Sequence, residues 1–479
     1  MPKVESPAMC QVHLNRPLTV VAAALLIVAF AAADDGPKLG LYVERMPTTS
    51  EIYSNYSWAK YEPLYGCYLG AFIDLDSTLQ RQYKDSIGRM RRYPEEFEER
   101  VGRRHATYFF YLGYGRPLPT DWVKKLAAEK KIVHIALEPN RGIQYVKEDV
   151  YLLELAWAMR DSGAKIFLRF GSEMNGAWVD YGKDPELYKE KFRLISKVMK
   201  REAPNVAMVW CPYTTPTRPI DNLYPGDDYV DWVGVNMYSV TFFDQDRNKP
   251  ASHIHPTEML DYIYEKYSDR KPIMIGEYGT THYSALEGKS VPAFARNNIF
   301  DLYSGLARKY PRVKAINYFN GNNLELAHRL NNNYAITQNA EVLKAYQQIT
   351  DVEYYLADDS AATPPALASA IGLAPVDGSD ASAQVPLAPM LLKDGDTVSG
   401  ILHLSGWCKT SNPDLRMLFR IDGKELYDGL GKQHWYVTIG VKRSNGVARI
   451  AEGWRTFSVE AWDGDKKIAT YSARVLVVH

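Results

Sequence analysis

The chain has 479 residues, which is too long for one ordinary hydrophobic core and predicts more than one domain. Its 57 Lys and Arg residues balance 57 Asp and Glu residues, so it lacks the basic surplus that binding to nucleic acid or to an anionic membrane requires. The 34 tyrosines and 10 tryptophans suit a carbohydrate ligand, whose C–H faces stack on aromatic rings. Tyrosine is also common in strands, which is the alternative explanation.

The first predicted element is a targeting segment. A basic flank with Lys3 and Arg16 precedes an apolar run over residues 18–33, which ends in three alanines before Asp34. Residues 1–33 are therefore typical of a secretory signal peptide. The run is short for a membrane-spanning helix, which needs about 20 residues. We expect a secreted or periplasmic protein that leaves the membrane after cleavage, with an uncleaved anchor as the alternative.

Eight apolar segments then alternate with amphipathic ones. The predicted strands are 67–74, 107–113, 132–139, 165–173, 206–212, 232–238, 272–279 and 313–320. Helical periodicity predicts helices at 120–131, 186–202, 256–267, 293–310 and 340–350. This alternation predicts an α/β fold, a (β/α)₈ TIM barrel, within a catalytic domain over residues 34–357. A doubly wound open sheet is the alternative, but no Gly-rich phosphate loop follows the first strand.

The last part of the chain differs in composition. Residues 358–387 are rich in Ala, Pro, Ser and Asp and lack periodicity, which predicts a linker. Short alternating runs over residues 388–479 predict a small all-β sandwich of immunoglobulin-like architecture, an accessory domain. Its tryptophans are expected in the sandwich core, with a glycan platform as the alternative: Trp407, Trp435, Trp454 and Trp462.

The sequence gives no signal for a metal or an organic cofactor. Cys10 lies in the predicted signal peptide, which leaves an odd number of cysteines and no disulfide framework: Cys67, Cys211 and Cys408. No CxxC or Cys/His cluster with the spacing of a zinc site occurs. The Asp-Gly pairs of the last segment are interpreted as hairpin turns rather than as calcium loops.

The densest polar motif, RFGSEMNGAW, begins at Arg169 and lies at the carboxyl end of the fourth predicted strand. The carboxyl ends of barrel strands face the active site, so a polar cluster there indicates catalysis. Alternation along a strand predicts that Arg169, Gly171 and Glu173 share one face, which points into the barrel. An Arg and a Glu in a barrel interior are costly unless they are paired or used.

A second motif, PIMIGEYG, places Glu277 at the end of the seventh predicted strand. Two carboxyl groups at one rim are what glycoside hydrolysis requires, because one protonates the leaving oxygen while the other attacks the anomeric carbon or activates water. A single Glu at a strand end is usually a solvated or capping residue. The occurrence of Glu173 and Glu277 after two apolar strands favours the catalytic interpretation.

The two motifs also carry a resemblance. FLRFGSEMNGAW resembles the strand-four signature of glycoside hydrolase family 26, and PIMIGEYG resembles the strand-seven motif of that family. Residues 138–140 (EPN) and 318–320 (YFN) are similar as well, within a region of about residues 60–350. The resemblance implies a retaining β-glycosidase with Glu173 as acid/base and Glu277 as nucleophile. Ser172 stands where mannanases of the family usually have His, so the resemblance does not carry mannan specificity to this chain.

The candidate substrate-binding residues surround this glutamate pair: Arg169, Asn175, Trp178, Tyr213, Tyr238 and Phe319. Arg169 is expected to keep Glu277 ionised, and Tyr238 to donate a hydrogen bond to it. The three rings of Trp178, Tyr213 and Phe319 are interpreted as sugar platforms, with ordinary packing as the alternative. His282 is a weaker candidate. The chain is thus predicted to be a retaining endo-β-glycosidase that acts on a polysaccharide: β-mannan, mixed-linkage β-glucan or a bacterial exopolysaccharide. The alternative is a polysaccharide-binding protein without catalysis.

Overall fold

The computed structural model describes residues 39–45, 59–63, 66–325, 332–352, 354–362, 388–399, 401–410, 412, 415–429, 436–440 and 450–478. The predicted signal peptide, most of the predicted linker and Trp435 lie outside these residues. Among the helices of the described ranges, none has the length and apolarity that crossing a membrane takes.

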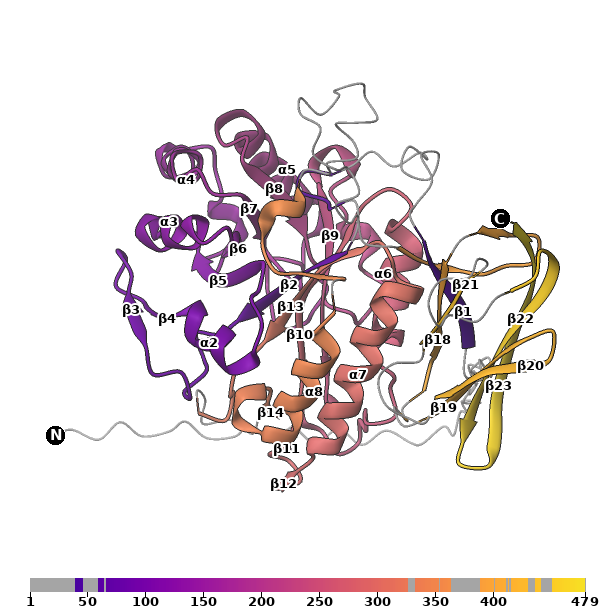
Figure 1. The fold of residues 1–479 in the computed structure, drawn as a ribbon. Helices are drawn as coiled ribbons and strands as arrows, with labels where there is room; N and C mark the ends of the chain where they lie inside the picture. Colours follow the sequence, from indigo (N-terminus) through magenta and orange to yellow (C-terminus); the bar gives the residue numbers. More distant parts are fainter. Residues whose placement is uncertain are drawn as a thin grey trace, which may run out of the picture. The chain divides into compact units, whose positions relative to one another are not determined.

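Eight parallel strands form a closed barrel, which confirms the predicted fold class (Figure 1). They are β2 (Cys67–Phe72), β5 (Thr107–Gly113), β6 (Ile132–Glu138), β7 (Ile166–Phe170), β8 (Val206–Trp210), β9 (Trp232–Ser239), β10 (Ile273–Thr280) and β13 (Val313–Phe319). The barrel closes where β13 pairs with β2, from Ala315 opposite Tyr68 to Phe319 opposite Phe72. Every residue of β2, β7, β8, β10 and β13 is buried, because helices cover the outside and side chains fill the inside.

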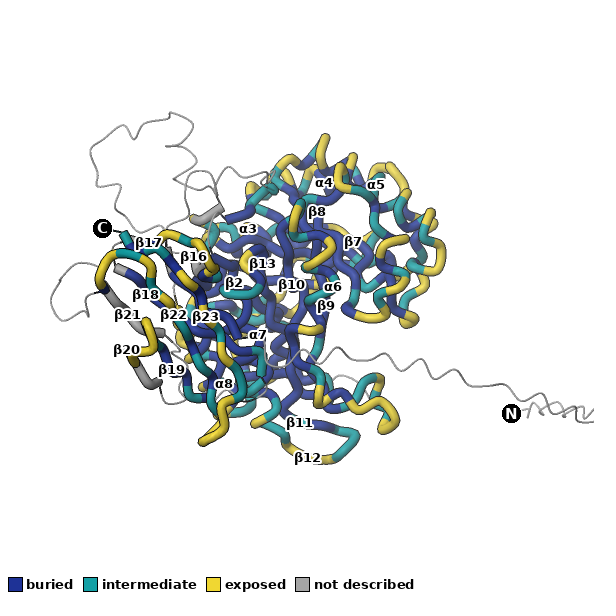
Figure 2. Tube along the Cα trace, turned by 90° about the vertical axis from the view of Figure 1, so that its right-hand side faces the viewer, coloured by how far each residue is buried: buried dark blue, intermediate teal, exposed yellow. Residues whose placement is uncertain are grey.

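Seven helices of the described chain accompany the strands. They are α2 (Pro94–Val101), α3 (Thr120–Ala128), α4 (Val150–Asp161), α5 (Pro185–Glu202), α6 (Glu258–Tyr267), α7 (Pro292–Lys309) and α8 (Ala340–Thr350). Figure 2 shows buried strands inside and exposed outer turns on α4 and α5. The sequence analysis missed α2 and α4. The start of α4 has a recognisable signal, because the Asp149 side chain accepts a hydrogen bond from the Leu152 N–H and caps the helix.

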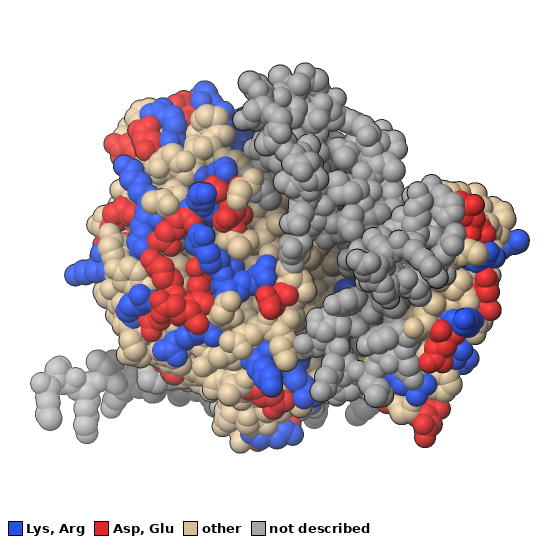
Figure 3. Space-filling model, viewed as in Figure 1, with Lys and Arg blue, Asp and Glu red and all other residues tan. Residues whose placement is uncertain are grey.

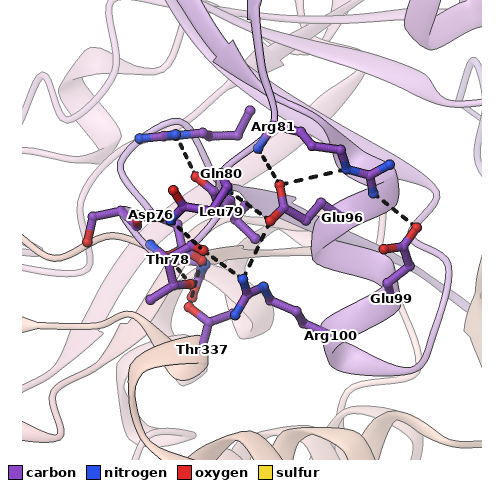
Figure 4. A network of polar contacts seen from close by, with 12 residues as sticks. Asp76, Thr78, Leu79, Gln80, Arg81, Glu96, Glu99, Arg100 and Thr337 are labelled. Atoms are coloured by element: carbon purple, nitrogen blue, oxygen red, sulfur yellow. Dashed lines mark hydrogen bonds and ion pairs between the residues drawn. The ribbon is translucent and has the colours of Figure 1, made fainter.

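Short strands complete the barrel region: β3 (Gln82–Lys84), β4 (Met90–Arg92), β11 (Tyr283–Ser284), β12 (Lys289–Ser290), β14 (Asn332–Asn333) and β15 (Tyr355–Leu356). A polar network holds the loop between β2 and α2 (Figure 4). The Glu96 carboxylate accepts the backbone N–H groups of Gln80 and Arg81 at 2.8 and 2.7 Å. The Asp76 carboxylate accepts from Asn320, which follows β13, at 2.6 Å. Asp76 therefore ties this loop to the seam at which the barrel closes.

The C-terminal segment forms two antiparallel-rich sheets. In the first sheet the strands lie in the order β16 (Ala388–Leu391), β1 (Leu39–Arg45), β18 (Ile401–Cys408) and β21 (Tyr436–Gly440). In the second sheet the order is β17 (Thr397–Ser399), β23 (Lys466–Val478), β22 (Gly453–Asp463), β19 (Arg416–Ile421) and β20 (Lys424–Gly429). Gly406 of β18 faces Val459 of β22 and Phe419 of β19, so the two sheets pack face to face. A small β domain is thus present, and its immunoglobulin-like character stays a prediction.

Strand β1 corrects the predicted domain boundary. It precedes the barrel in sequence, yet Leu41 pairs with Gly406 of β18, and Tyr42 pairs with Leu391 of β16. The boundary that assigned residues 34–357 to the barrel domain is therefore wrong for β1, because its backbone hydrogen bonds complete the C-terminal sheet. The chain starts the β domain, forms the barrel, and then returns to finish the β domain.

The C-terminal tryptophans do not share one role. Trp407 is buried and donates a hydrogen bond from Nε1 to Ser304 Oγ of α7 at 3.1 Å. Trp454 is exposed, with 48% of its surface accessible. The start of the predicted linker is also ordered, because Lys165 Nζ forms an ion pair with Asp359 at 2.9 Å. The cysteines Cys67, Cys211 and Cys408 are free and buried.

Candidate active site

A cleft of about 1160 Å³ opens at the carboxyl ends of the barrel strands. Loops and strand ends that lie far apart in sequence contribute its walls, as the barrel fold requires. Glu173 and Glu277 both line it. So do five of the six predicted substrate-binding residues: Asn175, Trp178, Tyr213, Tyr238 and Phe319. The fold therefore brings together the two motifs that the sequence analysis singled out.

Glu173 reaches the cleft in a different way from the one predicted. Strand β7 ends at Phe170, and Gly171 and Glu173 have left-handed backbone angles, with φ values of 55° and 58°. The prediction that β-strand alternation orients Glu173 is thus wrong. A hydrogen bond from the Glu173 N–H to the Cys211 carbonyl, 2.9 Å long, holds this turn instead. A left-handed conformation at a residue other than glycine is strained, and such strain often occurs at functional sites.

The Glu173 carboxyl group has two neutral donors. Asn236 Nδ2 donates to Oε1 at 2.8 Å, and Trp178 Nε1 donates to Oε2 at 2.7 Å. Burial, followed by the negative charge of Glu277, raises the pKa of Glu173 to about 7. The carboxyl group is therefore poised to hold a proton near neutral pH.

The Glu277 carboxylate has a different environment, because a cation accompanies its donors. Tyr111 OH donates to Oε1 at 2.6 Å, and Tyr238 OH donates to Oε2. The Arg169 guanidinium forms an ion pair with Oε1. Arg169 is fully buried and lies outside the cleft lining. Arg169 is therefore placed to support Glu277 from beneath the cleft, whereas the predicted contact of Arg169 with substrate does not fit this position.

Asn236 joins the two halves of the site, and the sequence analysis missed it. Its side-chain Nδ2 donates to Glu173, and its Oδ1 accepts from Arg169 Nη1 at 3.0 Å. The Asn236 amide thus connects Glu173, in the turn after β7, with Arg169, the cation that pairs with Glu277. The sequence did contain a signal for Asn236: side chains alternate along a strand, and Asn236 lies two residues before the predicted site residue Tyr238, on the same face of β9. The sequence analysis also missed Tyr111 of β5, which contacts Glu277 across the barrel.

A glycine beside Glu277 has no room for a side chain. The pairing of β10 with β9 is irregular between Ile275 and Glu277, at Gly276. A Cβ at Gly276 would lie 2.7 Å from Asn236 Oδ1 and 3.0 Å from Arg169 Nη1. The bulge therefore lets the strand pass close to the pair that supports both carboxyl groups.

Gly276→Ala is expected to destabilise the protein by about 1–3 kcal/mol through overpacking, and to disturb the hydrogen bond between Arg169 and Asn236. Gly113→Ala is the matched control, because Gly113 ends β5 and the nearest atom to an added Cβ is 4.0 Å away. Denaturant unfolding of the two variants gives the comparison. Equal stability of the two would contradict the close packing at Gly276.

Aromatic rings form much of the cleft wall. Trp178 is 54% exposed and stands perpendicular to Tyr213, with ring centroids 5.1 Å apart. Phe319 is mostly buried and stacks on Phe72 with a centroid distance of 4.9 Å. Trp178 thus offers an open ring to a ligand, whereas Phe319 contributes chiefly to the floor of the cleft.

Two predicted candidates are occupied by structural contacts. Asn175 Nδ2 donates to the carbonyl groups of Tyr213 and Pro216, and its Oδ1 accepts from the Tyr213 N–H. Its amide therefore braces two loops, although Asn175 lines the cleft. His282 is buried, bonds through Nε2 to the Ala335 carbonyl at 3.0 Å, and is outside the cleft lining.

A third carboxyl group, Glu138, lines the cleft beside Glu173. Ser172 Oγ donates to it at 2.6 Å, and Tyr181 OH donates at 3.1 Å. Burial raises the pKa of Glu138. Ser172, the position that departs from the family pattern, therefore serves to anchor Glu138. The sequence analysis noted Glu138 only through the resemblance.

Surface charge agrees with the neutral composition. On the face of the barrel that Figure 3 presents, basic and acidic side chains are interspersed and neither forms a large patch of its own. In the cleft lining, the acidic residues Glu138, Glu173, Asp244 and Glu277 outnumber Lys183 and Lys249. Burial favours the protonated forms of Glu138 and Glu173, so the lining carries no marked excess of either charge.

A closed barrel with an aromatic cleft and two carboxyl groups of unlike environment is the architecture of retaining barrel glycosidases. Residues 140–249 match the model of the family described as glycosyl hydrolase family 26. That stretch includes Glu173 and Asn236. Over this stretch the chain is therefore similar to glycosyl hydrolase family 26.

Relatives among characterised proteins are distant. A β-1,3-xylanase (TXYA) of Vibrio sp is 26% identical over 181 residues, which are 36% of this chain and 36% of the relative. Endoglucanase H of Acetivibrio thermocellus is 22% identical over 278 residues, 53% of this chain and 28% of the relative. The chain thus aligns with 36% or less of the length of these relatives.

Solved structures are similar at low identity. A GH26 β-mannanase from Bacteroides ovatus is 15% identical with a TM-score of 0.43, covering 61% of this chain and 90% of that chain. GH26C from Muricauda sp. is 12% identical with a TM-score of 0.45, covering 63% of this chain and 90% of that chain.

Proposed function

We propose that the protein is a retaining endo-β-glycosidase that hydrolyses a β-linked polysaccharide. The observation that carries the proposal is the unlike environment of two carboxyl groups in one cleft. Glu277 accepts hydrogen bonds from two tyrosines and forms an ion pair with the buried Arg169. Glu173 has only neutral donors, and its pKa is raised to about 7. A retaining mechanism needs one ionised and one protonated carboxyl group.

The proposed reaction has two displacements. In the first, Glu277 attacks the anomeric carbon while Glu173 gives its proton to the leaving glycosidic oxygen, which forms a glycosyl-enzyme ester and frees one part of the chain. In the second, ionised Glu173 removes a proton from water, which attacks the same carbon and releases Glu277. Asn236 and Trp178 hold Glu173 through both steps, since the amide N–H donates to Oε1 and the indole N–H donates to Oε2.

We propose a neutral β-glycan as the substrate. The cleft lining has no surplus of basic residues to bind a polyanionic glycan, and the exposed Trp178 ring offers a stacking surface for an uncharged sugar. The relatives are named as β-1,3-xylanases and an endoglucanase. The candidates are therefore β-1,3-xylan, mixed-linkage β-glucan, β-mannan and a neutral bacterial exopolysaccharide.

A panel of these soluble polysaccharides, assayed for new reducing ends, tests the proposal. We expect cleavage of one of them, and NMR of the first product should show the β-anomer, since a double displacement retains configuration. An α-anomer would contradict the retaining mechanism. Binding without cleavage would favour the alternative, a polysaccharide-binding protein without catalysis.

The pH dependence follows from the raised pKa of Glu173. Because the pKa lies near 7, the acid is protonated below that pH and loses its proton above it. We expect kcat/KM to fall as the pH rises through about 7. Trp178→Phe removes a hydrogen bond that lowers this pKa, so its basic limb should lie at higher pH. A limb at the same pH in both proteins would contradict the assignment.

We also propose that the protein is exported, because a polysaccharide substrate lies outside the cell and the apolar run over residues 18–33 is typical of a signal peptide. Mass spectrometry of protein purified from its source should give a chain that begins at Asp34. Recovery of the apolar run in the purified protein would favour a retained anchor.

A further inference from the structure

A second groove of about 380 Å³ lies beside the active-site cleft. The segments that follow β5 and β6 line it, so it opens on the same carboxyl-terminal face of the barrel. Its lining consists of Tyr114, Gly115, Pro139, Arg141, Gly142, Tyr145, Asp149 and Tyr151. The mechanism proposed above uses none of these residues.

The groove and the cleft share a wall. In the segment that follows β6, Glu138 and Asn140 line the cleft, whereas Pro139 and Arg141 line the groove. Side chains of successive residues thus point alternately to the two sides of one short segment. A linear ligand that leaves the cleft over this segment would enter the groove directly.

The groove presents an aromatic ring and a cation to solvent. Tyr145 is 60% exposed, which is the largest exposed fraction among the aromatic residues that the structure describes as exposed. Arg141 is also exposed, and within the described residues its guanidinium makes no hydrogen bond or ion pair. The rings of Tyr114 and Tyr151 are in contact, with centroids 4.9 Å apart, and their hydroxyl groups donate to the Lys147 and Arg116 carbonyls.

These features suit a sugar more than a protein or an anion. A flat ring stacks on the C–H face of a pyranose, while a guanidinium and a carboxylate bind its hydroxyl groups. Asp149 supplies this carboxylate, and its negative charge accompanies the positive charge of Arg141 in the groove. A groove that carries both charges has no preference for a polyanion, which matches the character of the cleft.

Building on the proposed function, we propose that this groove is a distal subsite that binds the same β-glycan chain several units away from the bond that is cleaved. Tyr145 is its stacking platform, and Arg141 and Asp149 bind the hydroxyl groups. The consequence is a preference for long chains, because only a chain that spans cleft and groove contacts both surfaces.

Binding is measured by titration calorimetry in the Glu277→Gln background, so that the result does not depend on turnover. The ligands are β-1,3-xylo-, mixed-linkage β-gluco- and β-mannooligosaccharides from trimers to octamers. Within the oligosaccharide series that binds, Tyr145→Ala is expected to lower the affinity for the longest chains about tenfold, because one stacked ring is lost. Tyr145→Trp should retain the affinity. Trp157→Ala is the control, because Trp157 is an exposed ring on α4 outside both linings.

The outcomes separate this inference from the proposed function. If Tyr145→Ala binds every chain length as its parent does, or if Trp157→Ala loses the same affinity, the groove is not a subsite, whatever the cleavage panel shows. Long chains of a glycan that the wild-type protein does not cleave could still bind more tightly when Tyr145 is present. That result would support the distal subsite and contradict the proposed catalysis. The first comparison requires that Tyr145→Ala unfolds at a temperature near that of its parent. If it unfolds early, Tyr145→Leu, which removes the aromatic ring but keeps apolar bulk, repeats the comparison with the same expected loss of affinity.

Discussion

Glu277→Ala is expected to reduce kcat/KM by about 10⁴-fold or more on every substrate, because no glycosyl-enzyme can form without the nucleophile. The loss should be as large on a dinitrophenyl glycoside as on the polysaccharide, since a good leaving group does not replace an attacking carboxylate. Initial rates with both substrates give the comparison. Glu265→Ala, an exposed carboxylate on α6, is the control and should keep wild-type rates.

Loss of folding must be separated from loss of chemistry in this experiment. Glu277→Ala leaves the fully buried Arg169 without its partner, and an unpaired buried charge destabilises a protein by about 3–5 kcal/mol. Glu277→Gln keeps the shape of the side chain and one acceptor oxygen, which can still accept a hydrogen bond from Arg169, although the negative charge is lost. It should be equally inactive while it unfolds closer to the wild-type temperature. Activity in a folded Glu277→Gln variant would place the nucleophile elsewhere.

Glu173→Ala is expected to separate the two substrates instead. Cleavage of polysaccharide should collapse, because its leaving oxygen needs the proton. A dinitrophenyl glycoside needs little protonation, so its first displacement should survive and the glycosyl-enzyme should accumulate for want of a general base. Added azide, which needs no base, should then speed turnover and give a β-glycosyl azide.

The product of azide rescue decides between the two assignments. A β-azide from Glu173→Ala supports Glu173 as acid/base, whereas the same product from Glu277→Ala would reverse the roles. Full polysaccharide cleavage in both variants would place the site outside this pair. Glu138→Gln serves as a further comparison, since Glu138 lies in the same cleft with a raised pKa of its own.

The periodic parts of the fold could be predicted because they obey local rules. All eight barrel strands lie where apolar runs predicted them, and β5 has the bounds Thr107–Gly113 that the sequence analysis gave. The two glutamates could be predicted because Glu173 follows a buried strand and Glu277 lies near the end of another, where a charge needs a partner or a use. Helix α2 was missed because its eight residues are too few to show a clear 3.6-residue period.

The details of the site needed three-dimensional information. The left-handed turn at Glu173 depends on a hydrogen bond to Cys211, which is distant in sequence. The contact of Tyr111 with Glu277 crosses the barrel between β5 and β10. The pairing of Ser172 with Glu138 explains the departure from the family pattern only once β6 and the β7 loop lie side by side. No local rule encodes such contacts, because they depend on barrel closure.

The position of β1 between β16 and β18 also determines how this protein is made and how it can be cut. During synthesis β1 emerges early, but its two neighbouring strands emerge only after the whole barrel. Until then the backbone N–H and C=O groups of β1 lack their partners, and they can pair with strands of other chains. Proteolysis of the backbone between β15 and β16 does not by itself separate the two folded parts, since β1 stays covalently attached to the barrel while it is hydrogen-bonded in the other sheet. Expression of residues 388–479 alone would yield a sheet without its second strand, in which β16 has lost its partner.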